Sequence, residues 1–539
     1  MFINTNKLYF KRLSESFPFL IIIFIIFPLV VFFGHHPTDH EFINSLSYRI
    51  SLGQLPYKDF DYVRPPLSLY LHSLSFFFFE NYAVLFSKAV FFSQMVFISH
   101  LSVKILNNIN FLPIKNQSWM MIIFLLLSLH NFPATPWHTI DGIFFSIIGI
   151  YFFSNGLIHQ KNYNYLLSGL CCGLAPLCKQ NFMVIPVVLL LSIIILKRSK
   201  LLYALLGVFI VAGCFFFFLY QNNLINLFIN SKSQGANLSS IILSLVEGFK
   251  VSTSYVILPS LIIYSILIFF SNTNLIAKKT SVLLLVLVFA FLNVLQLYIV
   301  SSESLPILLY QVILVSSIFL FIKNKKSIID FFEANNLVLI LLFFITITSM
   351  ISWGYPYPLL YISPYFAVIF NEFEKKWGNI DLKIIAFAVM IFWLYTTNIM
   401  YRDSAKTEAK NNLGQLYSRL NHIYVGDENF MLYKSIKDFS EGHEIETVIP
   451  DFPLYNYLYD KRPIFKIDWF LDLESSREPH AYLKEMEGKY FVIREKSYTE
   501  SGHPKRMELC NLIKENGTLI KIKNDLSLYR FSGINNHSD

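Results

Sequence analysis

Long apolar runs, separated by short polar segments, are the feature that most limits what this chain can fold into. About 20 apolar residues in a helix cross the hydrocarbon core of a bilayer, and a helix satisfies its own backbone hydrogen bonds there. We therefore predict a polytopic α-helical membrane protein with about 13 transmembrane helices. The spans are expected near residues 17–33, 81–103, 118–132, 139–157, 163–178, 181–196, 201–221, 254–270, 280–300, 305–322, 337–353, 357–372 and 383–400. The segment 66–79 is too short for a confident span, so we expect a half-buried helix or an extension of the next span.

The composition supports a membrane protein. Hydrophobic residues make up 54% of the 539 residues and charged residues 15%, whereas soluble proteins hold roughly 45–50% and about 25%. The net charge of +8 is then better explained by basic cytoplasmic loops than by nucleic-acid binding. The five cysteines follow neither a zinc nor a disulfide pattern, and we expect them to be packing residues. No cleavage site follows the first apolar run, which is expected to stay as the first span.

Lysine and arginine concentrate in every second loop, which predicts the orientation of the chain. Loops rich in these residues stay in the cytoplasm. The basic segments are the N-terminus, the loops at 104–115, 161, 197–200, 278–279 and 323–326, and the loop at 374–383. The N-terminus is therefore predicted to be cytoplasmic. The loops 34–80, 131–138, 178–181, 221–253, 301–304 and 353–356 are then expected on the outer face, together with everything after the last span.

The composition changes after residue 401. Residues 1–401 are predicted to form the transmembrane domain, and residues 402–539 a small extracytoplasmic α/β domain. Short β-like runs (HIYVGD, ETVIPDFP, RPIFKID, KYFVIRE and LSLYRF) alternate there with the helix-like stretches Ser404–Leu420 and His480–Glu487.

The first outer loop begins with a dense group of polar side chains: His35, His36, Asp39, His40 and Glu41. Residues 40–52 follow with apolar residues at helical spacing, and Gly53 is a plausible end. Such an amphipathic helix is expected to lie on the membrane plane. Asp39 would then lie at its N-terminus, where the helix dipole favours an anion. The alternative for Asp39 is an ordinary N-cap.

The second half of this loop gathers charges between two proline-containing turns. Lys58, Asp59, Asp61 and Arg64 lie in GQLPYKDFDYVRPPL. The segment is either a solvated loop with compensating charges or a place where chemistry happens at the membrane surface.

Three further residues fall on the predicted outer face: His138 and Asp141 beside the second outer loop, and Lys179 in the third. An acid at the mouth of an apolar helix is costly unless it faces a cavity or a partner. Asp141 is therefore either a second functional acid or a helix N-terminal acid. Imidazole and carboxylate suit zinc or manganese, so a divalent metal could be held by a set drawn from His36, Asp39, His40, His138 and Asp141.

Several of these motifs together resemble a known family. An acid in the first outer loop, then G-x-x-PY-x-D-F, then PPL-x-x-Y is similar to bacterial membrane glycosyltransferases of the GT-C superfamily. More narrowly, the chain resembles the dolichyl-phosphate-mannose protein mannosyltransferase-like branch, which includes the lipid A aminoarabinose transferases. GLCCGLAPLCKQNFMVIP, with Lys179, and IPDFPLYNYLYDKRPIF at 449–465 extend the resemblance over most of the chain.

The resemblance implies a reaction and a place for it. A sugar carried on a polyprenyl phosphate would be transferred to an acceptor hydroxyl at the outer face of the inner (plasma) membrane, usually with inversion. The acceptor would be a cell-envelope glycan, a lipid such as that of lipopolysaccharide, or a protein. Asp39 matches the position of the family's acid. Many members have Asp-Glu or Glu-x-x-Tyr there, so Glu41 stays open as the functional acid.

The residues and the resemblance together predict a membrane glycosyltransferase. Asp39 would activate the acceptor with help from Asp141, while Lys58, Arg64 and Lys179 would hold the donor phosphate. The remaining polar residues near this group, as further acids or metal neighbours, are Glu41, His36, His40, Asp61 and His138. Two alternatives remain: a transporter or flippase of lipid-linked glycans, and an O-antigen-type ligase that uses a diphosphate donor. Transporters place ionisable groups at mid-membrane, often in repeated halves, whereas here they concentrate in outer loops.

Overall fold

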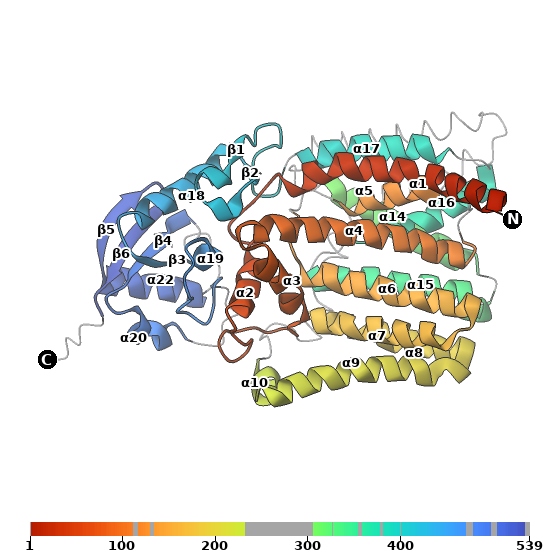
Figure 1. Ribbon diagram of the computed structural model, residues 1–539, viewed down its shortest axis with the longest axis horizontal. Helices are drawn as coiled ribbons and strands as arrows, with labels where there is room; N and C mark the ends of the chain where they lie inside the picture. The colour runs from red at the N-terminus through yellow and green to blue at the C-terminus, as the bar shows by residue number, and fades with distance from the viewer. Residues whose placement is uncertain are drawn as a thin grey trace.

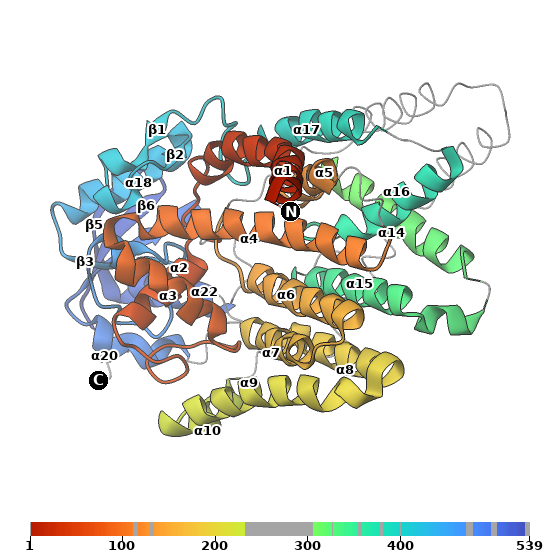
Figure 2. The ribbon, with the colours of Figure 1, turned by 45° about the vertical axis from the view of Figure 1, so that its right-hand side comes forward.

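The computed structural model describes residues 2–111, 117–129, 134–231, 305–325, 327–353, 358–377, 381–398, 400–470, 478–496 and 504–533. The apolar runs form helices that lie side by side in one bundle (Figure 1 and Figure 2). These helices are α1 (Phe2–Val31), α4 (Ala83–Asn108), α5 (Gln117–Ser128), α6 (His138–His159), α7 (Asn162–Cys178), α8 (Val184–Lys197), α9 (Leu201–Gln221), α14 (Leu305–Lys323), α15 (Ala334–Trp353), α16 (Ser363–Trp377) and α17 (Leu382–Asn398). The spans expected near 254–270 and 280–300 lie outside the described residues.

Length and composition qualify four helical segments of the described chain to cross a membrane: Glu80–Asn108, His138–His159, Gln180–Gln221 and Ala334–Ser352. Shorter apolar helices are Phe17–Val31, Leu67–Phe78, Gln117–Ser128 and Leu382–Asn398. The last expected span but one begins later than predicted, at Ser363 instead of residue 357. Pro364 explains this start, because proline is accommodated in the first turn of a helix but not in its interior.

Small residues let neighbouring helices approach closely. A Cβ atom on Gly169 of α7 would lie 2.0 Å from the carbonyl oxygen of Ala204 in α9, and one on Gly207 would lie 2.3 Å from that of Leu166. Helices in lipid pack through such contacts. On its outward side α9 exposes Phe209, at 66%, which suits a helix that faces lipid.

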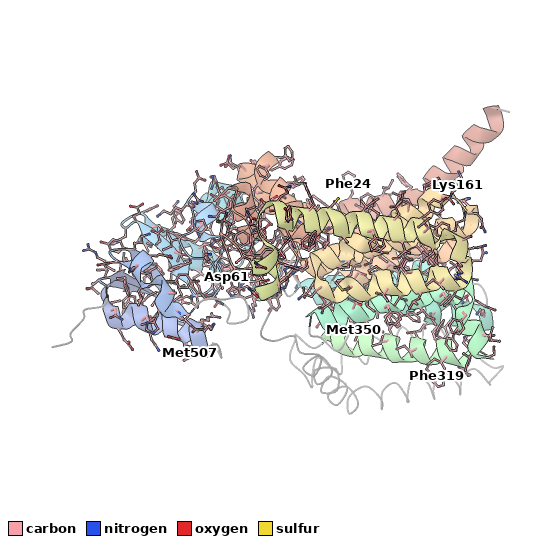
Figure 3. The ribbon with its side chains drawn as sticks, turned by 90° about the horizontal axis from the view of Figure 1, so that it is seen from below. Phe24, Asp61, Lys161, Phe319, Met350 and Met507 are labelled. Atoms are coloured by element: carbon pink, nitrogen blue, oxygen red, sulfur yellow. The ribbon has the colours of Figure 1, made fainter. Side chains whose placement is uncertain are left out.

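The polar and basic ends of the bundle are separated in space. Asp61 lies near the C-terminal part of the chain, whereas Lys161 lies at the far end of the bundle (Figure 3). The charge pattern of the loops predicts this separation of the two residues.

Two short helices connect the bundle to the C-terminal part. α3 (Leu67–Phe78) occupies the half-buried segment expected at 66–79. α2 (Phe42–Ser51) lies within the range expected for a surface helix, and Gly53, at φ +77°, ends it with a hydrogen bond to Ile50 O at 2.9 Å. However, every residue from Phe42 to Ile50 is buried. The expectation of a surface helix is therefore wrong, because α3 and the C-terminal part cover it. Its position on the membrane plane stays a prediction.

The C-terminal part contains a four-stranded sheet between helices. Its strands are β3 (Ile445–Ile449), β4 (Tyr490–Arg494), β5 (Gly517–Lys523) and β6 (Leu526–Phe531), in the order β3-β4-β6-β5, and its main helices are α18 (Asp427–Ser440) and α22 (Pro504–Asn516). β3 and β4 are parallel and the other neighbours are antiparallel. Side chains alternate along a strand. Val448 and Val492 accordingly pack with α18, while Ile449 and Ile493 pack with α22.

Some predictions for this part are wrong. RPIFKID is not a strand, and Ser404–Leu420 holds β1 (Asn411–Asn412) and short 3-10 turns instead of a helix. Asp403 Oδ1 accepts from Ser404 N, and Asn412 Oδ1 accepts from Gly414 N. Such side-chain bonds compete with helix formation. Other short elements of this part are β2 (Tyr424–Val425), α19 (Tyr455–Leu458) and α20 (Leu483–Met486), and a short helix α10 (Ile225–Asn230) follows α9 in the bundle. The domain boundary near residue 401 stays a prediction.

Candidate functional site

The chain leaves α1 in a turn that joins the bundle to the C-terminal part. Gly34 N donates to Tyr424 O at 2.9 Å. Lys88 of α4 donates its ammonium to Gly34 O at 2.6 Å and to Phe33 O at 3.2 Å. The start of the first outer loop is thus held from both sides.

Glu41 is fully buried, and its carboxylate accepts three hydrogen bonds. Oε1 accepts from His35 Nε2 at 2.9 Å and from the Tyr433 hydroxyl, while Oε2 accepts from Leu454 N at 3.1 Å. Burial raises the pKa of Glu41 well above its usual value, although the bonds from Tyr433 and Leu454 oppose this shift. Because both oxygens have protein donors, Glu41 connects the loop to the C-terminal part.

Asp39 differs from Glu41 in its exposure and its partner. Its side chain is 15% exposed, and Oδ2 lies 3.3 Å from Nη1 of Arg402. Burial raises the pKa of the Asp39 carboxyl above its usual value, and the Arg402 charge and a hydrogen bond from Tyr401 partly oppose this. Asp39 does not start α2, whose N-cap is Glu41. The expected placement of Asp39 at the helix N-terminus is therefore wrong, because the turn through His40 separates it from the helix.

The neighbouring histidines, His36 and His40, are buried. His36 Nδ1 lies 2.8 Å from Thr38 Oγ1, and His40 Nδ1 accepts from His36 N at 2.8 Å. Burial, with the charges of Arg494 and Arg402, lowers the pKa of His36 to about 3. Burial also lowers the pKa of His40 well below its usual value. Both side chains shape the turn around Asp39.

The body of α2 is tied to the C-terminal part by a buried ion pair. Arg49 donates from Nε to Asp468 Oδ2 at 2.7 Å and from Nη2 to Oδ1 at 2.6 Å. The Arg49 side chain is 1% exposed and that of Asp468 3%. Arg49 also donates to Phe465 O at 2.6 Å and to Gln54 Oε1 at 3.3 Å.

The second half of the loop turns Arg64 back toward α2. Tyr57, at φ +69°, donates its hydroxyl to Arg64 O at 2.6 Å. The Arg64 guanidinium lies over the Phe42 ring, 5.7 Å from its centroid. Asp61 donates its backbone N–H to Lys466 O. Lys58, in contrast, is exposed. Lys58 is therefore not brought into the group around Arg64.

His138, the first residue of α6, lies where several loops meet. It is 2% exposed, and neither ring nitrogen has a hydrogen-bond partner among the described residues. Its ring stacks on Tyr62 at 6.3 Å. Arg64, Lys179 and His72 all lie close enough to act electrostatically on it. Arg64 and Lys179, which come from distant parts of the sequence, therefore both lie in the surroundings of this imidazole.

Lys179 reaches this place from the end of α7. The residue leaves the helix in an extended conformation, and its ammonium donates to the backbone oxygen of Ser352 in α15. Cations are favoured near the C-terminal carbonyls of a helix.

Asp141 is fully buried one turn further into α6. Its carboxylate lies 3.1 and 3.2 Å from His72 Nε2 of α3 and accepts from Gln94 Nε2 of α4 at 2.7 Å. An acid at this depth needs such partners. The Asp141 contacts and the Asp39 contacts belong to separate hydrogen-bond networks, although the sequence predicts that the two acids act together.

The residues around Asp39 and those around His138 are connected by the segment that runs from His40 into α2. His40 O accepts from Thr135 Oγ1 at 2.8 Å, and the Phe42 ring lies 6.0 Å from that of His138. Among the described residues, no three His, Cys, Asp or Glu side chains are grouped as metal ligands. The metal set hypothesised from His36, Asp39, His40, His138 and Asp141 is thus not assembled.

Three contributors escaped sequence reasoning: His72, Gln94 and Arg402. His72 and Gln94 are polar residues inside apolar helices, which is a usable signal. Arg402 directly follows the last span, and nothing in its neighbourhood singles it out.

Comparisons with known proteins find a similar solved structure. No family model matches the chain, and no curated protein matches it significantly. The structure is that of ArnT from Cupriavidus metallidurans in the apo state, with 10% identity, a TM-score of 0.47, and coverage of 96% of this chain and 98% of that one. The likeness concerns the overall arrangement of the two chains.

Proposed function

We propose that this protein is a membrane glycosyltransferase that moves a sugar from a polyprenyl-phosphate donor to an acceptor hydroxyl at the outer end of the bundle. The observation that carries the proposal is that Arg64 and Lys179 both border the buried His138, beside helices that expose apolar surface. Arg64 covers the Phe42 ring, which lies 6.0 Å from that of His138. Lys179 donates to Ser352 O, and the Ser352 hydroxyl lies 2.7 Å from that of Thr139, the neighbour of His138. A donor with a phosphate head and a hydrocarbon tail fits both features.

The cations would stabilise the leaving group. When the sugar carbon forms its bond to the acceptor oxygen, its bond to the phosphate oxygen breaks, and that oxygen takes the electron pair. Arg64 and Lys179 are suited to offset the charge that develops there. Lys58, which is exposed, has no part in this version of the proposal.

Asp39 would accept the proton of the acceptor hydroxyl. A general base works best with a pKa near the working pH, and burial moves the pKa of Asp39 in that direction. Its partial exposure leaves it open to an acceptor, unlike the enclosed Glu41. Asp141, held by His72 and Gln94, would support the donor side.

The test compares envelope glycans by mass spectrometry. Cells lacking the gene would be supplied with the wild-type protein, Asp39→Asn or Lys179→Met. We expect the glycan product to be lost with either variant at normal protein level. Glu444→Gln and Lys434→Met, at exposed positions of the C-terminal part, are matched controls and should restore it. Normal product with Asp39→Asn would refute the assignment.

A second experiment separates the enzyme from a transporter or flippase. The purified protein in detergent has no membrane potential or second compartment, so a transporter has no measurable product there. Sugar transfer in detergent would support the enzyme, whereas transport by the protein in sealed vesicles, without transfer in detergent, would exclude it.

A further inference from the structure

Arg402, four residues after the end of α17, contacts the proposed base directly. Nη1 of Arg402 lies 3.3 Å from Asp39 Oδ2 and donates a hydrogen bond to Thr38 Oγ1 at 3.1 Å. The guanidinium therefore bridges two adjacent residues of the turn. Such a bridge restricts the turn and the carboxylate together.

The backbone at Arg402 is held in an unusual conformation. Its φ is +52°, in the left-handed region that a side chain with a Cβ rarely adopts. Asn429 of α18 fixes it by donating from Nδ2 to Arg402 O at 3.1 Å and to His35 O at 3.2 Å. Asp403 Oδ1 accepts from Gly426 N at 2.9 Å. Strained residues that persist in this way are concentrated at functional sites.

The other charged groups near Asp39 do not replace this contact. Asp451 acts on Asp39 electrostatically with the same sign, and Tyr401 donates a hydrogen bond to it. Arg494 and Arg506 each lie 3.4 Å from Asp451 Oδ2. Among the described residues, Arg402 is the cation in ion-pair contact with Asp39.

We propose that Arg402 is a positioning residue that holds the Asp39 carboxylate in place for the acceptor, so that the C-terminal part completes the site. The inference rests on the proposed function, in which Asp39 is the base. It also gives the region after the bundle a definite role, because α18, through Asn429, sets the backbone from which Arg402 reaches the first loop.

The test uses the full-length protein with Arg402→Gln and Arg402→Lys. Arg462→Gln, at an exposed position, is the matched control. Turnover would be followed against pH in membranes, with the glycan product of the comparison above as readout. We expect Arg402→Gln to lower kcat about 10- to 100-fold. The acid limb of the pH–rate profile of this variant should move to higher pH. The reason is that the Asp39 carboxylate loses a stabilising cation, which raises its pKa. Arg402→Lys should keep the acid limb, and Arg462→Gln should match the wild type.

A second measurement needs no substrate. Infrared difference spectra taken across a pH titration report protonation of carboxyl groups, and the band missing in Asp39→Asn belongs to Asp39. We expect the midpoint of that band to rise in Arg402→Gln and to stay in Arg462→Gln.

The outcomes distinguish the two proposals. Full turnover in Asp39→Asn refutes the proposed function. An inactive Asp39→Asn, together with an unshifted band and acid limb in Arg402→Gln, refutes the positioning role alone.

Discussion

The ion pair between Arg49 and Asp468 should be a main attachment of the first outer loop to the C-terminal part. The two residues are more than four hundred positions apart, and their side chains share two charge-assisted hydrogen bonds with almost no exposure to solvent. Asp468→Ala would leave the guanidinium buried, with Phe465 O and Gln54 Oε1 as its remaining acceptors in the described part of the chain.

The expected loss is large because the remaining charge cannot reach water. Removing one partner of a buried pair costs about 3–5 kcal/mol. Replacing both partners by apolar side chains, in Arg49→Met with Asp468→Leu, removes the unpaired charge. Phe465 O then loses its donor, at a cost of about 1–3 kcal/mol. The double variant should therefore be more stable than Asp468→Ala.

Unfolding in detergent, followed by tryptophan fluorescence, measures this difference. Trp469 lies next to Asp468, and its ring is 5.4 Å from that of Phe42 in α2, so its emission reports on this contact. A Trp469→Phe background identifies its share of the signal. The matched control is Glu372→Ala, which breaks the exposed pair with Lys375 and should cost about 0–1 kcal/mol.

Two results would contradict the reasoning. One is an Asp468→Ala protein within about 1 kcal/mol of the wild type, the range of an exposed pair. The other is a double variant that is less stable than Asp468→Ala, which would mean that packing, and not the unpaired charge, sets the cost.

Three further predictions concern single residues. His36 has a pKa lowered to about 3, so below pH 6.5 the unfolded chain binds a proton that the folded chain does not. The free energy of unfolding should thus decrease as the pH is lowered, by about 2 kcal/mol at pH 5. His36→Gln should remove that loss in melting curves recorded between pH 7 and pH 5. Gly142→Ala would place a Cβ 2.6 Å from the Phe182 ring and should destabilise the protein by about 1–3 kcal/mol. Adding Phe182→Leu should restore part of the melting temperature. An unchanged melting temperature in Gly142→Ala would count against this packing. His72→Phe should destabilise the protein by about 3–5 kcal/mol because it removes a donor to the buried carboxylate of Asp141, and adding Asp141→Asn should recover part of it.

The site was only partly predictable from the sequence. Residue type and loop position were enough to select Asp39, Arg64, His138 and Lys179 as candidates for one face. They could not separate Asp39 from Glu41, since both are acids in the same turn. The difference comes from Tyr433 and Leu454, which enclose Glu41 but not Asp39. The two contacts join residues 392 and 413 positions apart, and no local pattern records them.

The sequence by itself determined the helical runs, the basic and polar ends of the bundle, the stop at Gly53 and several strands. Each of these depends on local periodicity, charge or backbone freedom. Only the tertiary structure decided that α2 is buried, that Asp141 pairs with His72, and that Arg402 reaches Asp39. These features arise where side chains from distant segments meet out of contact with water, and there burial and the available partner decide what a charged group can do.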